Sequence, residues 1–231
     1  MSEINYPSAK KFDISIDRTL EIRQRNESLK IAKSVLDIAR IAIDFAAVER
    51  VPRYTSIRRE NDAEHSFMLG LAATEIAFIQ FPELDHGLVT QFALVHDLVE
   101  LETKDVPTFQ LDEAGFTAKA LAEKVATDKL VRSLPRYMGQ LLLRYEAQVE
   151  PESRFVRHID KLLPYGVDHV SGTLKQVMAE DYDVHALPEL MVANERIESR
   201  YQLLFPEPSH KVLHIAHNII FDRNAMEYDE D

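Results

Sequence analysis

The sequence predicts an all-α protein with a single helical domain. Apolar side chains recur at helical spacing through most of the 231 residues, and no segment shows the alternation of a half-buried strand. The chain has only 6 glycines, too few for an all-β protein rich in turns, and its prolines mostly fall between the periodic segments. A chain of this length can bury a sizeable core without disulfides or a structural metal.

The first elements can be placed from the amino end. Residues 29–48 carry apolar side chains at helical steps and predict a helix. Residues 50–60 are basic and show little periodicity, so we expect a loop there. Asn61 is expected to cap the next helix, and Glu64, three residues later, completes a capping box. That helix should end before Pro82.

The remaining elements are also predicted to be helices. Asp85 is expected to cap a third helix, which continues through Val99 and ends before Pro107. Further helical patterns lie at residues 111–133, 136–149, 152–169, 189–204 and 210–221. The chain is therefore expected to divide into a loose N-terminal segment, one helical domain and an acidic tail, at residues 1–20, 21–222 and 223–231.

The composition excludes several classes of function. Lys and Arg total 27 against 39 Asp and Glu, and the net charge of −12 opposes a general electrostatic grip on nucleic acid or an anionic membrane. The absence of cysteine excludes thiol catalysis, Cys-ligated zinc, iron–sulfur clusters and a disulfide scaffold. The chain opens on no signal-peptide pattern and contains no apolar stretch of transmembrane length, so we expect a cytoplasmic protein.

Three ionisable residues interrupt the apolar third helix. Residues 92–101 are apolar on nearly every face, which predicts burial, yet His96, Asp97 and Glu100 lie among them. If the helix is continuous, all three share one flank. Buried ionisable groups are costly unless they are paired or bind a metal. A His–Asp dipeptide alone fits either a hydrogen bond that closes a core or a metal site.

Two further residues favour the metal site. His65 lies in the first turn of the preceding helix, and Asp160 lies on the apolar face of a later one. With His96 and Asp97 they make a set of two imidazoles and two carboxylates, which suits Mn²⁺, Co²⁺, Fe²⁺, Mg²⁺ or Zn²⁺ and leaves room for water. Their separations fit helices that converge on one ion. The sequence therefore predicts one divalent metal ion, whose identity stays open.

A second group of histidines lies near the carboxyl end. His210, His214 and His217 lie at positions i, i+4 and i+7 of the last predicted helix. The first two have the spacing of metal ligands, but no carboxylate partner is close in the sequence. A surface or interface stripe is therefore favoured over a second metal site.

Six segments of the chain resemble one family, in order and at matching spacings. They are Arg50-Val51-Pro52, Arg58 to Ser66, His96 to Glu100, Lys104 to Thr108, Tyr145 to Gln148 and Phe155 to Asp160. Together they resemble the His … His-Asp … Asp pattern of the HD-domain metal-dependent phosphohydrolases. Within that superfamily they are most similar to the bacterial 5′-deoxynucleotidases and their eukaryotic relatives. The resemblance covers about residues 35–170.

The resemblance implies roles for individual residues. The ligands of one divalent metal ion would be His65, His96, Asp97 and Asp160. Glu100 would be the catalytic carboxylate that activates or steers water. Asp105 would contact the substrate and belong to the catalytic residues. Arg50 matches an arginine associated with substrate and sugar recognition, and Glu146 lies where relatives approach the substrate.

Arginines ahead of His65 extend the expected substrate site. Arginine is the preferred planar ligand of phosphate, so we expect contacts from Arg50 and Arg58, with Arg53 and Arg59 as weaker candidates. The resembled deoxynucleotidases typically carry tryptophan after the first of these arginines, and here the residue is Val51. Val51 does not offer the broad flat surface that an indole ring presents to the sugar, so a preference for deoxyribonucleotides over ribonucleotides should be weak.

These observations predict a metal-dependent phosphohydrolase that hydrolyses nucleoside 5′-monophosphates, ribo- or deoxyribo-, to nucleoside and phosphate. The alternatives are action on a nucleoside triphosphate, a cyclic nucleotide or a non-nucleotide phosphate, or a nucleotide- or metal-binding regulatory module with little turnover. Glu100 and Asp105 favour an enzyme, because a pure binder would not need Glu100. The expected partners are a small phosphorylated substrate and, as in many relatives, a second copy of the chain, with no nucleic acid and no membrane.

Overall fold

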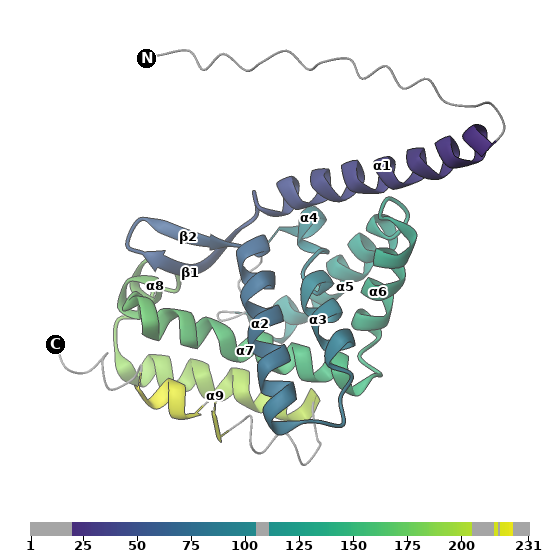
Figure 1. The fold of residues 1–231 in the computed structure, drawn as a ribbon. Coiled ribbons are helices and arrows are strands. Elements are labelled where there is room, and N and C mark those ends of the chain that lie inside the picture. Colours follow the sequence, from purple (N-terminus) through teal and green to yellow (C-terminus); the bar gives the residue numbers. More distant parts are fainter. Residues whose placement is uncertain (1–19, 105–110, 205–214, 217, 224–231) are drawn as a thin grey trace, which may run out of the picture.

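The computed structural model describes residues 20–104, 111–204, 215–216 and 218–223 (Figure 1). A short antiparallel hairpin, β1 (Glu49–Thr55) and β2 (Arg58–Asn61), follows the first helix. The helices are α1 (Leu20–Phe45), α2 (Asp62–Gln80), α3 (His86–Val95), α4 (Glu100–Thr103), α5 (Glu113–Leu130), α6 (Arg136–Ala147), α7 (Pro151–Ser171), α8 (Leu174–Asp181) and α9 (Leu187–Leu204). The prediction of an all-α fold is confirmed, with this hairpin as a small addition.

The main core lies among α2, α3, α6 and α7. Its fully buried side chains include Leu69, Phe92, Leu142 and Val156, one from each of these helices. A second, smaller cluster packs β1 against the end of α7, α8 and α9, and Val51 and Tyr165 belong to it. The metal-ligand candidates lie on the helices of the main core or in the turn directly after α3, so the packing of that core positions them.

The two predicted helix caps are present. Asn61 has an extended backbone, and its side chain accepts a hydrogen bond from the Glu64 N–H while the Glu64 carboxylate accepts one from the Asn61 N–H. The Asp85 side chain accepts a hydrogen bond from the Leu88 N–H. These caps satisfy N–H groups that have no partner inside the helix. The first cap also fixes the start of α2 three residues before His65.

The segment expected as a loop forms the β-hairpin instead. β1 and β2 pair antiparallel, with Glu49 opposite Asn61 and Arg53 opposite Arg59. The prediction of a loop was wrong because several buried positions of the hairpin carry charged side chains. Arg50 and Glu60 are both buried, so the alternation of buried and exposed positions is hidden from a reading based on hydrophobicity.

The third helix also ends earlier than expected. α3 stops at Val95, residues 96–99 form turns, and α4 begins at Glu100. The Ala93 carbonyl accepts a hydrogen bond from the His96 ring at 2.8 Å, and the following Leu98 and Glu100 N–H groups bond three residues back. The shared helical flank expected for His96, Asp97 and Glu100 is therefore wrong, because a sequence of tight turns presents them.

The first helix was predicted over residues 29–48, whereas α1 runs from Leu20 to Phe45. Many of its apolar side chains are more than half exposed, including Leu29, Ile31, Val35 and Ile43. Figure 1 shows why, since most of α1 extends away from the bundle. The short helix α8 was not predicted. Within 210–221, the described residues 215–216 and 218–221 are helical.

Several residues with sequence predictions lie outside the part of the chain that the structure describes. His210, His214, His217, Asp105, the segment before residue 20 and the tail after residue 223 lie outside the described residues. Among the helices that are described, none combines the length and the apolar character needed to cross a membrane.

Candidate metal centre

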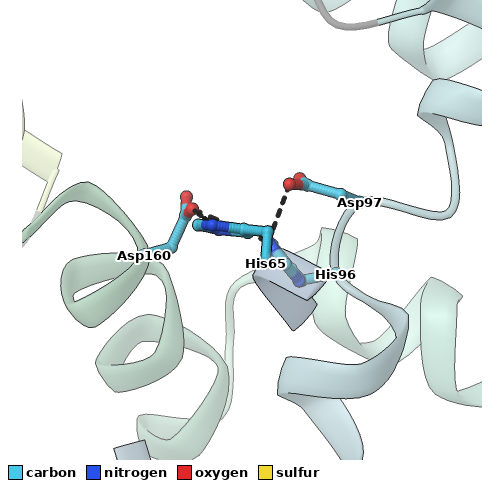
Figure 2. Close-up of side chains that lie close together, drawn as sticks. All are labelled: His65, His96, Asp97 and Asp160. Atoms are coloured by element: carbon cyan, nitrogen blue, oxygen red, sulfur yellow. Dashed lines mark hydrogen bonds and ion pairs between the residues drawn. The ribbon is translucent and has the colours of Figure 1, made fainter. Parts of the chain in front are cut away.

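The four predicted metal ligands come together in the structure (Figure 2). His65 comes from the first turn of α2, His96 and Asp97 from the turn after α3, and Asp160 from the middle of α7. One ligand atom from each lies within 4.8 Å of the others. His65 Nε2 is 3.0 Å from Asp160 Oδ1, and His96 Nε2 is 2.8 Å from Asp97 Oδ2 and 3.6 Å from Asp160 Oδ1.

Three of the four ligand candidates are almost fully buried, and the fourth is partly exposed. His65, His96 and Asp160 are at most 3 % exposed. The Asp97 side chain is 16 % exposed and is the ligand candidate with the most contact with solvent. Ile159 and Val156, next to Asp160 on α7, are also fully enclosed by the main core. Asp97 is therefore the ligand candidate through which solvent most readily reaches the cluster.

The tautomer of His96 can be derived from its backbone contact. The Ala93 carbonyl can only accept a hydrogen bond, so His96 Nδ1 donates to it. In the neutral ring Nε2 then carries a lone pair, and it faces oxygens of Asp97 and Asp160, which are acceptors too. Buried acceptors that face one another need a proton or a metal ion between them. This arrangement fits a metal ion bound by both imidazoles and both carboxylates.

Glu60 supports the second imidazole and was missed as a functional residue. Its carboxylate is fully buried, and its Oε1 lies 2.6 Å from His65 Nδ1. A proton on Nδ1 facing Glu60 leaves His65 Nε2 directed at Asp160, the arrangement that carboxylates commonly impose on metal-binding histidines. The only signal in the sequence was a carboxylate five residues before His65. That spacing alone did not predict the contact, because it depends on the hairpin that places Glu60 beside the His65 ring.

The electrostatics of the cluster favour charged carboxylates beside a cation. Burial would lower the pKa of His96, but Asp97 and Asp160 outweigh it and raise the pKa to about 10. Burial would raise the pKa of Asp97, yet the His96 ring and the Arg50 guanidinium hold that pKa well below its usual range. The pKa of Asp160 is also lowered, against the effect of burial, by Lys161 and the two imidazoles.

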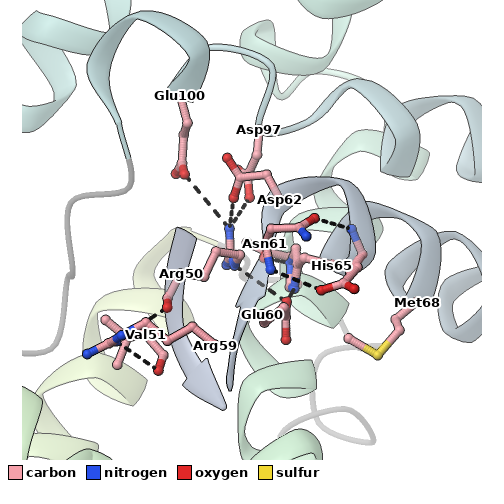
Figure 3. Close-up of polar contacts among 12 residues, drawn as sticks. Arg50, Val51, Arg59, Glu60, Asn61, Asp62, His65, Met68, Asp97 and Glu100 are labelled. Carbon is pink, nitrogen blue, oxygen red and sulfur yellow. Dashed lines mark hydrogen bonds and ion pairs between the residues drawn. The ribbon is translucent and has the colours of Figure 1, made fainter. Parts of the chain in front are cut away.

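Arg50 lies at the centre of a second group of carboxylates (Figure 3). Its Nη1 is 2.6 Å from Asp97 Oδ2, 3.2 Å from Asp62 Oδ1 and 3.9 Å from Glu100 Oε2. Its Nε lies 3.6 Å from Glu60 Oε1. Asp62, Asp97 and Glu100 form a second set of ligand atoms within 4.8 Å of one another. The structure thus places Arg50 among acidic side chains next to the predicted metal ligands.

The other arginines of the hairpin are paired as well. Arg53 bonds to Glu180 at 2.8 Å and to Asp181 at 3.1 Å, and Arg59 also bonds to Asp181. Arg58 pairs with Glu64, and its side chain is half exposed. The hairpin arginines therefore join the two strands to α2 and α8, and Arg58 is the one most open to solvent.

α6 and α7 supply further polar groups beside the cluster. The Tyr145 ring is buried and packs edge-on against His96, with the ring centroids 6.1 Å apart. The Arg157 guanidinium lies over the Tyr145 ring and is 3.8 Å from Glu146, whose pKa is raised by burial. Lys161 Nζ is 2.7 Å from Asp160 Oδ2, and its side chain is one third exposed.

The HD domain family model matches residues 47–190, well over half of the chain, and this match includes all four ligand candidates. The chain belongs to the HD domain family. A 5′-deoxynucleotidase from Yersinia pestis (strain Pestoides F) is 29% identical over 128 residues, 51% of this chain and 64% of the relative. A 5′-deoxynucleotidase from Yersinia pseudotuberculosis (serotype O:1b, strain IP 31758) matches equally well. The chain thus spans just under two thirds of the length of these curated relatives.

A solved structure supports the HD fold independently. It is described as a predicted metal-dependent phosphohydrolase from Magnetospirillum magnetotacticum MS-1. The superposition has a TM-score of 0.58 at 22% identity and covers 84% of this chain and 94% of the other. At this identity the similarity shows the fold alone.

Proposed function

We propose that the protein is a metal-dependent phosphohydrolase that converts nucleoside 5′-monophosphates to nucleoside and phosphate. The observation that carries the proposal is the convergence of two imidazoles and two carboxylates from α2, the α3–α4 turn and α7, with ligand atoms within 4.8 Å of one another. The match to the HD domain family supports this chemistry. The 5′-deoxynucleotidase relatives support a nucleoside monophosphate as the substrate.

One divalent ion would be held by His65, His96, Asp97 and Asp160. Such an ion would draw negative charge from the phosphoryl oxygens and so make the phosphorus easier to attack. Mn²⁺, Co²⁺, Fe²⁺, Mg²⁺ and Zn²⁺ all suit a set of imidazoles and carboxylates. Asp97 is the most exposed of the four, so the substrate would approach the ion from its side.

Glu100 is the proposed carboxylate that orients water and takes its proton. It begins α4, is 6% exposed, and belongs to the carboxylate group beside Asp97 rather than to the four ligand candidates. A carboxylate that neighbours the ligands without being one can accept a proton from the attacking water. Asp105 remains a further candidate for substrate contact and catalysis, outside the described residues.

Two cations of α7 are further candidates for binding the phosphate group. Arg50 is surrounded by four carboxylates and its side chain is only 9% exposed. Lys161 and Arg157, on α7, each pair with one carboxylate and have side chains that are 33% and 28% exposed. We propose that these two cations contribute to phosphate binding. Arg58 and Glu146 remain candidates at the rim, since the Arg58 side chain is 53% exposed.

Release of inorganic phosphate from a panel of substrates tests the proposal. The purified protein is incubated with ribo- and deoxyribonucleoside 5′-monophosphates, after EDTA treatment and after addition of each candidate metal. We expect turnover of monophosphates that depends on the metal, with only a weak preference between the two sugars because Val51 packs into the second cluster and offers no flat wall. Turnover of triphosphates, cyclic nucleotides or non-nucleotide phosphates without monophosphates would refute this substrate assignment, and no turnover at all would favour a regulatory module.

A further inference from the structure

The carboxylates around Arg50 have the dimensions of a cation site. The ligand atoms of Asp62, Asp97 and Glu100 all lie within 4.8 Å of one another. Oxygens on opposite sides of a divalent ion, each about 2.1–2.4 Å from it, are separated by about 4.2–4.8 Å. Asp62 is fully buried and Glu100 nearly so, which makes their unshielded charges costly without a cation.

In this structure the cation among them is the guanidinium of Arg50. Nη1 lies within 4 Å of an oxygen of each of the three carboxylates, at 3.2 Å, 2.6 Å and 3.9 Å (Figure 3). The guanidinium keeps its charge at any ordinary pH, so it neutralises the group permanently. β1 holds it there, because Arg50 is the second residue of that strand and its carbonyl accepts a hydrogen bond from Arg59.

Asp97 connects this group to the proposed metal site. Its Oδ2 is 2.8 Å from His96 Nε2 on one side and 2.6 Å from Arg50 Nη1 on the other. Asp97 belongs to both sets of ligand atoms. A cation in the second group would therefore share a ligand residue with the ion in the first.

We propose that the Arg50 guanidinium fills a second cation position of the centre, formed by Asp62, Asp97 and Glu100, and so limits the centre to one divalent metal ion. The inference rests on the proposed function only in taking His65, His96, Asp97 and Asp160 as the site of the first ion. Replacing Arg50 with a neutral side chain leaves three neighbouring carboxylates without their cation, and a second divalent ion then binds there.

This role separates metal binding from activity. In an Arg50→Met protein, Glu100 becomes a ligand of the second ion and is no longer available to accept a proton from water. The variant is expected to bind more metal than the wild type and to turn over less substrate. An arginine that only bound phosphate would lower turnover without changing the metal content.

The test counts Mn²⁺ ions per chain and asks whether they are coupled. The wild type and the variants R50M, R50M/D62N and R58M are loaded with Mn²⁺, passed through a desalting column, and measured by elemental analysis and low-temperature EPR. R58M is the matched control, because it removes a guanidinium from the same hairpin that pairs with Glu64 and lies outside both groups. R50M/D62N removes one positive and one negative charge together with one ligand of the second position.

We expect one isolated Mn²⁺ in the wild type, R58M and R50M/D62N, and two exchange-coupled Mn²⁺ in R50M. Two ions in the wild type, or a single ion in folded R50M, would overturn the inference while leaving the proposed function intact. No ion in the wild type would overturn the first site as well. If R50M unfolds without metal, recovery of its helical circular dichroism with two bound Mn²⁺ supports the inference, and failure to recover where R50M/D62N folds contradicts it.

Discussion

At the scale of single residues, the four ligand candidates that the sequence singled out lie together in the structure, whereas the residues around them were not predicted. His96, Asp97 and Asp160 stood out as ionisable residues on apolar helical faces, where burial demands a partner, and His65 stood out in the first turn of the preceding helix. The role of Glu60 and the carboxylates around Arg50 depend on the register of a hairpin that the sequence did not reveal. Contacts of that kind are set by tertiary packing, so composition and spacing carry no trace of them.

Loss of a ligand should remove metal and activity together. Asp97 is the ligand candidate most exposed to solvent, and Asp97→Ala deletes an oxygen from a set of four that converge within 4.8 Å. We expect its metal content and its phosphate release both to fall to background, while circular dichroism shows a retained fold, since the core is large. Asp128→Ala, an exposed substitution on α5, is the control. A full metal complement in Asp97→Ala would rule out the ligand assignment.

Loss of the proposed proton acceptor should give a different result. Glu100→Gln keeps the shape of the side chain but removes its basicity. Because Glu100 is outside the four ligand candidates, we expect normal metal content and substrate binding, with kcat lowered by roughly 10²–10⁴, the usual contribution of a general acid–base group. Glu102→Gln, on the exposed side of α4, should retain activity. Near-normal kcat in Glu100→Gln with its metal in place would make Asp105 the leading candidate.

At the scale of elements, the two capped helix starts were predicted and the end of α3 was not. Asn61 and Asp85 both cap where the sequence indicated, because capping depends on residues three positions apart. The end of α3 at Val95 depends instead on the His96 ring bonding back to the Ala93 carbonyl, a choice that no local propensity marks. From the α3–α4 turn, the adjacent residues His96 and Asp97 both reach the cluster.

The cap of α2 links the stability of an element to the site. Asn61→Ala removes the side-chain acceptor for the Glu64 N–H. We expect the free energy of unfolding to fall by about 0.5–2 kcal/mol, the usual cost of losing a cap, as measured by urea denaturation. Because His65 lies in the first turn of α2, metal affinity should weaken too, which isothermal titration with Mn²⁺ can show. Asn61→Asp keeps an acceptor and should restore both properties, and an unchanged unfolding free energy in Asn61→Ala would argue against a stabilising cap.

At the scale of the whole molecule, the apolar surface of α1 calls for a partner. The helix spans Leu20–Phe45 and exposes Leu29, Ile31, Val35 and Leu36 by 58–66%, so the apolar periodicity that predicted this helix marks an exposed face. We expect a homodimer that covers this face. Sedimentation equilibrium should give a dimeric mass for the wild type and a monomeric mass for Ile31→Glu/Val35→Glu. A wild-type monomer at micromolar concentration would refute this expectation.

The pH dependence of stability should reveal a buried carboxyl far along α7 from the metal ligands. Asp168 is 5% exposed, and burial raises its pKa to about 7, with Glu60 and Asp181 contributing further. The unfolded chain binds this proton only below about pH 4, whereas the folded chain keeps it up to about pH 7. Over that interval the folded state holds the extra proton, so rising pH lowers the free energy of unfolding by up to about 1.4 kcal/mol per unit.

Asp168→Asn removes this titration and keeps the shape of the side chain. Relative to the wild type, the variant should gain about 1–4 kcal/mol of unfolding free energy at pH 8, an advantage that disappears below about pH 4 because the wild-type carboxyl is then protonated in both states. Urea denaturation at pH 4, 6 and 8, with the same metal content at each pH, provides the measurement. Asp128→Asn, in an exposed position on α5, should show no such trend. If the stability difference between Asp168→Asn and the wild type instead stays constant with pH, the carboxyl is ionised in the folded protein. That result would contradict the raised pKa of Asp168.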